Sequence, residues 1–173
     1  MKKKAKPKKK AVLKKKVTPI PAGYHSVTPY LTIRDAAQAI DFYKRALGAK
    51  ELMRMPGPGG KVGHAELKIG DSIVMLSDEF PGTSTCHAPT SLGGATAMLF
   101  LYVPNVDAAF ERAENAGCKV LKPLADMFWG DRYGQLEDPF GNQWGLATHK
   151  EDVTPKEMAR RAQAAMAQRP GNP

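Results

Sequence analysis

Residues 33–49, IRDAAQAIDFYKRALGA, decide the fold, because their pattern returns about seventy residues later in residues 103–118, VPNVDAAFERAENAGC. In each stretch the end of an apolar segment meets a residue that commonly caps helices, Asp35 or Asn105. Apolar side chains then recur at helical spacing, and a glycine is placed to stop the helix. The chain therefore contains an internal duplication. The apolar positions are Ala36, Ile40, Tyr43 and Leu47 in the first helix and Val106, Ala109, Phe110 and Ala113 in the second.

One strand-like segment precedes each predicted helix, and three follow it. Glycine-rich and Asp-Pro turns separate several of these segments, as is typical of neighbouring antiparallel strands. The order β-α-β-β-β thus occurs twice, which predicts an α+β fold. Because one such unit cannot cover both faces of its own sheet, two tandem βαβββ units should form a cup-shaped mixed sheet around a shared interior, with the helices outside. The expected strands are 25–33, 49–55, 61–69 and 72–77 in the first copy and 97–103, 118–123, 133–137 and 143–148 in the second.

The charge of the chain is concentrated at one end. The 173 residues carry a net charge of +9, but residues 1–16 hold ten lysines and no acid, which leaves 16 basic against 17 acidic residues elsewhere. We expect residues 1–23 to be a disordered Lys-rich arm that either solubilises the protein or binds polyanions weakly through salt-sensitive attraction. Sequence-specific recognition of nucleic acid is not expected, since no aromatic side chain is interleaved with the lysines.

The pattern predicts one folded domain at 24–149, built of units 24–78 and 96–149. In the remaining segment, 150–173, Thr154 and Glu157 have the spacing of a capping box, which predicts a C-terminal helix followed by a tail. The helix has one apolar face, and we expect this face to pack on the protein's own surface or on a second subunit. It consists of Met158, Ala162, Ala165 and Met166.

The sequence also predicts the localisation, the state of the cysteines and the oligomeric state of the protein. No apolar run is long enough to span a bilayer, so we expect a soluble, cytoplasmic protein. Cys86 and Cys118 lack the close spacing of structural zinc sites and are expected to be reduced thiols. We also expect a homodimer, because closed two-fold pairing is the commonest way to cover exposed sheet edges.

Four motifs within residues 27–149 carry a resemblance to a known family: IDFYKRALGAKEL at 40–52, GHAELKIGD at 63–71, FWGDRYG at 128–134 and EDPFGNQWGLATH at 137–149. Together they resemble the vicinal oxygen chelate superfamily of glyoxalase and bleomycin-resistance folds, and the last two motifs are similar to its PhnB-like branch. The resemblance implies a cup-shaped sheet that encloses a small molecule, often completed by a dimer partner. In many members it also implies a divalent metal that chelates two neighbouring substrate oxygens.

The resemblance also allows the metal to be tested position by position. In the glyoxalase I arrangement the ligands lie on the first and last strands of each unit, which correspond here to Pro29, Val74, Met98 and Gly145. None of these side chains is a ligand for a hard or borderline metal ion. We therefore expect no metal of the glyoxalase I type and no other cofactor.

A metal site at other positions remains an alternative. His64 and Glu66 lie two residues apart on a predicted strand, so their side chains share a face. Glu137 occupies the matching position of the second unit. These three side chains together would give a three-ligand set for a divalent metal around the cavity. The competing interpretation is that the glutamates face solvent and that His64 is a satisfied, partly buried histidine.

A second group of candidate residues lies in the FWGDRYG motif. Phe128, Trp129 and Tyr133 would form a pocket wall that stacks on a planar ligand, while Arg132 pairs with a carboxylate or phosphate of that ligand. Trp144, on the last strand, is a further candidate for the same wall. In the competing interpretation Arg132 forms a local ion pair with Asp131 and the aromatic side chains fill the core.

These patterns favour a metal-free protein that binds a small molecule. The alternative is a metal-dependent lyase, isomerase or oxygenase that uses His64 with Glu66 or Glu137. If catalysis proceeds without a metal, His64 and Glu137 are the expected acid–base groups. The sequence contains no Gly-x-Ser-x-Gly elbow, P-loop or dinucleotide fingerprint, which argues against a hydrolase, kinase, NTPase or dehydrogenase.

Overall fold

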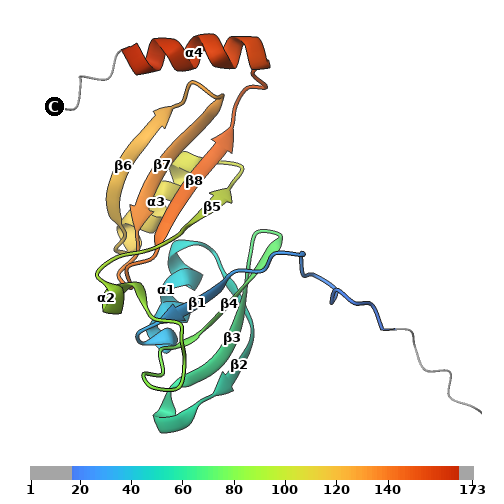
Figure 1. Cartoon of the computed structure of the whole chain (residues 1–173), viewed down its shortest axis with the longest axis vertical. Coiled ribbons are helices and arrows are strands. Elements are labelled where there is room, and N and C mark those ends of the chain that lie inside the picture. Colours follow the sequence, from blue (N-terminus) through green and yellow to red (C-terminus); the bar gives the residue numbers. More distant parts are fainter. Residues whose placement is uncertain (1–16, 168–173) are drawn as a thin grey trace, which may run out of the picture.

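The computed structural model of the chain describes residues 17–167, so most of the expected Lys-rich arm lies outside the described residues. Two copies of a βαβββ unit follow one another, as predicted (Figure 1). The first unit consists of β1 (Tyr30–Ile33), α1 (Ala36–Ala46), β2 (Lys50–Pro56), β3 (Val62–Ile69) and β4 (Ser72–Asp78). The second consists of β5 (Met98–Tyr102), α3 (Val106–Ala116), β6 (Lys119–Asp126), β7 (Asp131–Glu137) and β8 (Gln143–His149).

Each unit forms its own four-stranded mixed sheet, and the two sheets have the same topology. The strand orders are β1-β4-β3-β2 and β5-β8-β7-β6. In both sheets the first strand runs parallel to the last, and the other neighbours are antiparallel. This shared order confirms the duplication and the α+β class. Within the described residues no hydrogen-bonded strand pair joins the two sheets, so a single chain does not close them into one barrel.

The helices begin and end where the sequence predicts. The side chain of Asp35 accepts a hydrogen bond from the backbone N–H of Gln38, at 3.2 Å, and that of Asn105 accepts one from Ala108, at 3.1 Å. These contacts satisfy N–H groups that the first helical turn leaves free. At the other end of α3, Gly117 has a φ of 116°, a conformation that glycine adopts without steric cost.

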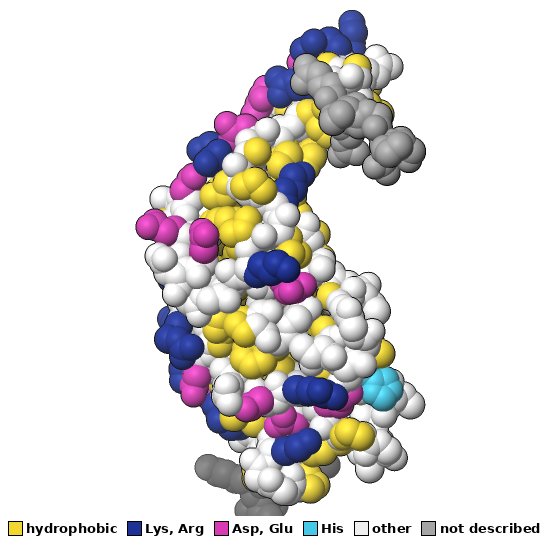
Figure 2. All heavy atoms as spheres, turned by 90° about the vertical axis from the view of Figure 1, so that its left-hand side faces the viewer, with side chains coloured by type: hydrophobic (Ala, Val, Ile, Leu, Met, Phe, Trp, Pro, Cys, Tyr) yellow, Lys and Arg dark blue, Asp and Glu magenta, His cyan; other side chains and the backbone are white. Residues whose placement is uncertain are grey.

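The two units are joined on the helix side of their sheets. Helices α1 and α3 pack together there, and the Arg112 side chain of α3 donates to the Ala46 carbonyl at 3.0 Å. A buried polar cluster also crosses between the units: Asp138 accepts from the Tyr43 hydroxyl at 2.7 Å and from the Trp144 indole at 2.9 Å. The Asp-Pro-Phe-Gly-Asn motif therefore ties the second unit to α1. The molecule as a whole is bent, with one side hollowed (Figure 2).

The first strand is shorter than expected, because only Tyr30–Ile33 pairs with β4. Pro29 has no N–H to donate to a ladder, although its carbonyl still accepts from Met75 at 2.9 Å. The preceding residues lie against the first sheet instead: Gly23 lies beside Ile73, and the hydroxyl of Tyr24 bonds to Glu66. The part of the chain just before the domain is thus attached to it.

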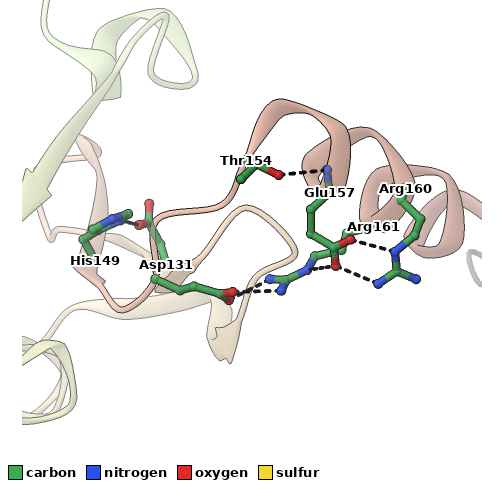
Figure 3. Close-up of polar contacts among 7 residues, drawn as sticks. Asp131, His149, Thr154, Glu157, Arg160 and Arg161 are labelled. Atoms are coloured by element: carbon green, nitrogen blue, oxygen red, sulfur yellow. Dashed lines mark hydrogen bonds and ion pairs between the residues drawn. The ribbon is translucent and has the colours of Figure 1, made fainter.

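A C-terminal helix, α4 (Pro155–Ala167), is present as predicted. The hydroxyl of Thr154 accepts from the Glu157 backbone N–H at 3.3 Å, which confirms the cap (Figure 3). Arg161 holds α4 to the preceding segment through two bonds of 2.7 and 2.9 Å to Glu151. No residue of α4 is buried, and Met166 is 69% exposed, so this chain covers the predicted apolar face only in part.

The remaining expectations concern membrane-spanning helices and the two cysteines. No helix in the described part of the chain is both long and apolar enough to cross a membrane. Both cysteines are free. Cys118 is buried, and burial raises the pKa of its thiol to about 12, so this thiol is not reactive at neutral pH.

Candidate functional site: an aromatic face on the second sheet

One face of the second sheet packs on α3, and the other is open. A Cβ added to Gly134 of β7 would meet the ring of Phe110 at 2.5 Å, so Gly134 faces the helix. A Cβ added to Gly145 of β8 would instead meet the rings of Tyr133 and Phe100, at 2.9 and 3.0 Å. Since strand side chains alternate and paired residues share a face, these two glycines identify the two sides of the sheet.

The open side carries a set of aromatic side chains, which we call the aromatic face. The rings of Phe100 and Tyr133 are parallel within 3°, with centroids 5.3 Å apart. Tyr102 lies beside Phe100 at 5.1 Å, and the Lys122 ammonium lies over the Tyr133 ring at 5.4 Å. Phe100 is 44% exposed and Tyr102 is 60% exposed. The aromatic face is defined by Met98, Phe100 and Tyr102 of β5, Lys122 of β6 and Tyr133 of β7.

A polar cluster lies at one end of this face. The carboxylate of Asp131, only 3% exposed, accepts hydrogen bonds from the Tyr102 hydroxyl at 2.9 Å, the Trp129 indole at 3.0 Å and His149 Nδ1 at 2.8 Å. Burial raises the pKa of Asp131, but these donors outweigh burial and hold the pKa below its ordinary value. The bonds from Asp131 and then from Asp152 raise the pKa of His149.

The first sheet has a different polar cluster on its open side. The Tyr30 hydroxyl lies 3.2 Å from His64 Nδ1, and His64 Nε2 lies 3.3 Å from Glu66. The hydroxyl of Tyr24 also bonds to Glu66, and this bond raises the pKa of Tyr24. His64 and Glu66 therefore share a face, as the sequence predicts. Both are already engaged by tyrosines, which the sequence did not indicate.

Glu137 does not join this pair within one chain. It lies on β7, where its strand neighbours are Lys119 and Gln143. Among residues 17–167, no group of three His, Cys, Asp or Glu side chains is placed to hold a metal ion. The positions implied for a glyoxalase I metal also do not fit one, because Met98 and Gly145 lie on the aromatic side without a ligand for a hard or borderline ion and Val74 is a buried core residue.

Arg132 lies on the helix side of β7, away from the aromatic face. Its guanidinium makes a bidentate pair with Asp107 of α3, with bonds of 2.6 to 3.0 Å, and a longer contact of 3.4 Å with Asp126. This placement differs from the expectation that Arg132 holds an anionic ligand. It also differs from the alternative of a pair with Asp131, because residues 131 and 132 point to opposite sides of the strand.

The predicted aromatic residues divide between site and core. Tyr133 belongs to the aromatic face, and Trp129 lies at its edge, 6.0 Å from the Tyr133 ring. Phe128 packs edge-on against Trp129 at 5.0 Å, near α4. Trp144, at 2% exposed, belongs to the core, where its indole N–H donates to Asp138 and its ring contacts Tyr43.

Phe100, Tyr102, Asp131 and His149 were not predicted as site residues, although the sequence contains a signal for each. The signal for the first two is the run Met-Leu-Phe-Leu-Tyr at 98–102, which is apolar on both faces of a strand that has a helix on only one. The signal for the last two is the turn at 138–142. If Glu137 pairs with Gln143, antiparallel register also pairs Asp131 with His149, as the structure has it.

Comparison with known proteins agrees with the fold and with the resemblance. Residues 23–146 match the family described as the Glyoxalase/Bleomycin resistance protein/Dioxygenase superfamily, and the chain belongs to this superfamily. The uncharacterized protein Rv0887c of Mycobacterium tuberculosis is 47% identical over 143 residues, which cover 82% of this chain and 82% of that protein.

Two solved structures are informative for different reasons. TnmS3, an antibiotic binding protein from Streptomyces sp. CB03234, is 25% identical with a TM-score of 0.56, and the match covers 78% of this chain and all of that one. A PhnB protein from Bacillus cereus has a TM-score of 0.56 at 18% identity, covering 72% of this chain and 99% of that one. The second likeness concerns the fold alone.

Proposed function

We propose that this protein binds a planar aromatic small molecule on the aromatic face. The observation that carries the proposal is the stacked pair of Phe100 and Tyr133, in which Phe100 remains 44% exposed. A flat ligand laid on Phe100 extends this stack by one layer and removes apolar surface from water. A soluble protein rarely leaves such side chains together in the open unless they bind something.

The flanking groups indicate which ligand fits. Met98 and Tyr102 widen the apolar surface on either side of Phe100 along β5, and Lys122 supplies a positive charge beyond Tyr133. A fused-ring molecule with an oxygen-bearing edge meets these requirements. The similarity to TnmS3, an antibiotic binding protein, supports a small-molecule ligand.

We propose that binding requires no metal. The side chains of the aromatic face bind through apolar and aromatic contacts, and none of them is a usual ligand for a divalent ion. Metal analysis of protein purified without a histidine tag tests this: a divalent ion held at one per subunit, and lost in His64→Ala, would favour the metal-dependent alternative.

We also propose a homodimer. In the described chain each sheet ends in two edge strands with no further strand beside them, β1 and β2 in the first sheet and β5 and β6 in the second. A second copy of the chain covers such edges with closed symmetry. Light scattering of the full chain should give the mass of a dimer. A monomer at concentrations well above micromolar would contradict this proposal.

Binding itself is tested with daunorubicin, a planar aromatic antibiotic, by following the quenching of tryptophan fluorescence. We expect saturable binding that Phe100→Ala weakens by about tenfold, as expected for the loss of one aromatic contact. Leu92→Ala is the matched control, because Leu92 is an exposed apolar residue, 56% accessible, on the short helix α2 (Pro89–Leu92) away from β5. Equal affinities for the two variants would mean that the ligand binds elsewhere.

A further inference from the structure

Asp131 is a buried carboxylate that accepts hydrogen bonds from three different segments. Tyr102 reaches it from β5, Trp129 from the turn before β7, and His149 from the end of β8. All three contacts converge on the open side of the sheet, since Asp131 pairs with His149 across the ladder and has the same orientation as Tyr133. Burying a charged carboxylate is costly unless it is hydrogen-bonded. The three donors offset this cost, and the question is why the chain places a charge here at all.

The histidine in this cluster has one fixed nitrogen and one accessible nitrogen. Its Nδ1 bonds to Asp131 at 2.8 Å, which fixes the ring orientation (Figure 3). Its Nε2 lies 3.0 Å from Asp152, whose side chain is fully exposed, and His149 itself is half exposed. A bond to a solvated carboxylate is easily exchanged for a bond to a ligand.

Maintaining the local structure does not require this histidine. The backbone N–H groups of Lys150 and Glu151 both donate to the Gly130 carbonyl, at 2.9 and 3.0 Å, and Arg161 binds Glu151. These contacts already hold the segment after β8 to the turn before β7. A structural role therefore accounts for the position of the backbone but not for an oriented imidazole on a buried carboxylate.

The cluster is continuous with the aromatic face through one side chain. The ring of Tyr102 contacts Phe100 at 5.1 Å, and its hydroxyl contacts Asp131 at 2.9 Å. Along β8 the same side of the sheet continues from Gly145, beside Phe100, to His149, so a fused-ring ligand that lies on Phe100 and extends along Tyr102 would point one edge toward His149.

We propose that His149 is an acid–base residue and that Asp131 is its positioning residue, acting on an aromatic ligand with an acidic C–H or O–H at that edge. The neutral imidazole accepts the proton at Nε2, and the imidazolium returns it to another atom of the same ligand, so that the net reaction is an isomerisation. No oxidant, reductant or further reactant enters. The proposal rests on the proposed binding face and adds a reaction to it.

The charges around His149 fix the direction of its pH dependence. Asp131 of β7 and Asp152 of the following segment bond to it, the Tyr102 phenol of β5 shares Asp131, and the nearby Glu151 is paired with Arg161. The two carboxylates raise the pKa of His149 above its ordinary value. Since only the neutral imidazole accepts a proton, proton removal should increase with pH through that raised pKa.

The test uses 5-nitrobenzisoxazole, a planar aromatic probe that a base converts in one step. Removal of its ring C–H proton forms a nitrile as the N–O bond breaks, and the product is a coloured nitrophenolate. We expect the full chain to accelerate this reaction, and His149→Gln to lower kcat/KM at least tenfold. His25→Gln, a change of an exposed histidine outside both clusters, should leave the rate unchanged.

Asp131→Asn provides the readout that separates positioning from simple support. With one carboxylate removed, the midpoint of the pH–rate profile should move to lower pH, whereas a merely structural role would leave the midpoint in place. If Asp131→Asn does not fold, the profile of Asp152→Asn should shift in the same direction by a smaller amount. An unchanged rate in His149→Gln, or the same loss in His25→Gln, would overturn the proposal.

Phe100→Ala distinguishes a failure of the proposed binding face from a failure of the proposed acid–base pair. Phe100→Ala should raise KM for the probe with little change in kcat, since it removes contact area and not the base. If Phe100→Ala has no effect while His149→Gln abolishes the rate, the acid–base pair exists but the ligand lies elsewhere. If daunorubicin binds to the face but His149→Gln has full activity, the protein binds a ligand without this chemistry.

Discussion

At the scale of single residues, Gly134 shows how closely α3 packs on the second sheet. A Cβ at this position would lie 2.5 Å from the Phe110 ring and 3.1 Å from the Lys122 carbonyl oxygen. The ring has little freedom to move, because Phe110 is only 6% exposed. We expect Gly134→Ala to lower the free energy of unfolding by about 1–3 kcal/mol, as overpacking does in other cores. Urea denaturation measures the change.

Gly94→Ala is the control for this substitution. A Cβ at Gly94 meets nothing within 4 Å, and its φ is outside the left-handed region. Its stability should equal or slightly exceed that of the parent chain, because the unfolded state loses freedom. If both variants unfold at the same urea concentration, the packing assigned to Gly134 is incorrect.

The pair of Arg132 and Asp107 leads to a second prediction at this scale. Because Arg132 is on the helix side of β7, Arg132→Lys should leave daunorubicin affinity unchanged. A double-mutant cycle with Asp107→Asn should give only a small coupling energy, since Asp107 is 58% exposed and water screens the pair. A tenfold loss of daunorubicin affinity in Arg132→Lys would show that Arg132 contributes to ligand binding.

At the residue scale the sequence predicts least, because it does not show which side chains of the candidate site lie together. It singled out the FWGDRYG motif correctly as a place where aromatic and charged side chains gather. It did not establish which of them share a face, because β6 pairs with β7 through two irregularities of register, between Val120 and Lys122 and between Lys122 and Ala125. The partner of Arg132, Asp107, lies 25 residues away on a helix, and no local pattern indicates it.

At the scale of elements, one carboxylate organises the linker 79–94. Glu79, whose side chain is 6% exposed, accepts bonds from Ser91, from the Ala88 backbone N–H at 3.2 Å, from His87 and from Arg34. The bond from Ser91, with those from Ala88, His87 and Arg34, lowers the pKa of Glu79 from 4.5 to about 2 despite partial burial.

This depressed pKa predicts a pH dependence of stability. A carboxylate that binds its proton less tightly in the folded state stabilises the fold above its unfolded pKa, and the contribution is lost as the pH falls toward the folded value. Glu79→Gln should therefore be less stable than the parent chain at pH 7, and the difference should narrow between pH 4.5 and about 2.

Thermal unfolding across this range measures the effect, with Glu114→Gln on the exposed side of α3 as control. A constant difference between Glu79→Gln and the parent at all pH values would show that the carboxylate has another role.

Elements were well predicted wherever a local signal marks their ends. The three long helices and their caps, and seven of the eight strands, follow from apolar periodicity, Asp, Asn or Thr caps and turn signals. The predicted first strand is too long because the strand-like run 25–33 includes Pro29, which cannot donate to a ladder, while the short helix α2 has too few residues to show periodicity.

At the scale of the whole molecule, the sequence predicts the duplication and the α+β fold of tandem βαβββ units, but not the contacts that join the two copies. The copies meet through α1, α3 and the buried Asp138 cluster, and each sheet has one uncovered side. Contacts such as that between Tyr43 and Asp138, 95 residues apart, depend on tertiary packing that local patterns do not encode.

The last prediction concerns the Lys-rich residues 1–16. All the buried apolar side chains of the described chain lie between Ile33 and Ala147, and acidic and basic side chains are interspersed on the face shown in Figure 2. Deleting residues 1–16 should therefore change the melting temperature by no more than about 2 °C, which is at or below the shift of about 2–4 °C that a loss of 1 kcal/mol produces in a chain of this length.

The same deletion removes ten lysines and leaves 16 basic against 17 acidic residues. Since lysines release counterions when they neutralise a polyanion, the full chain should bind heparin in a strongly salt-dependent way, and the truncated chain should pass through the column at low salt. If the truncated chain keeps its heparin affinity despite these charge counts, the folded domain itself must carry a basic surface. A large drop in melting temperature would instead mean that the lysines contact the domain, in which case the arm is a part of the folded structure.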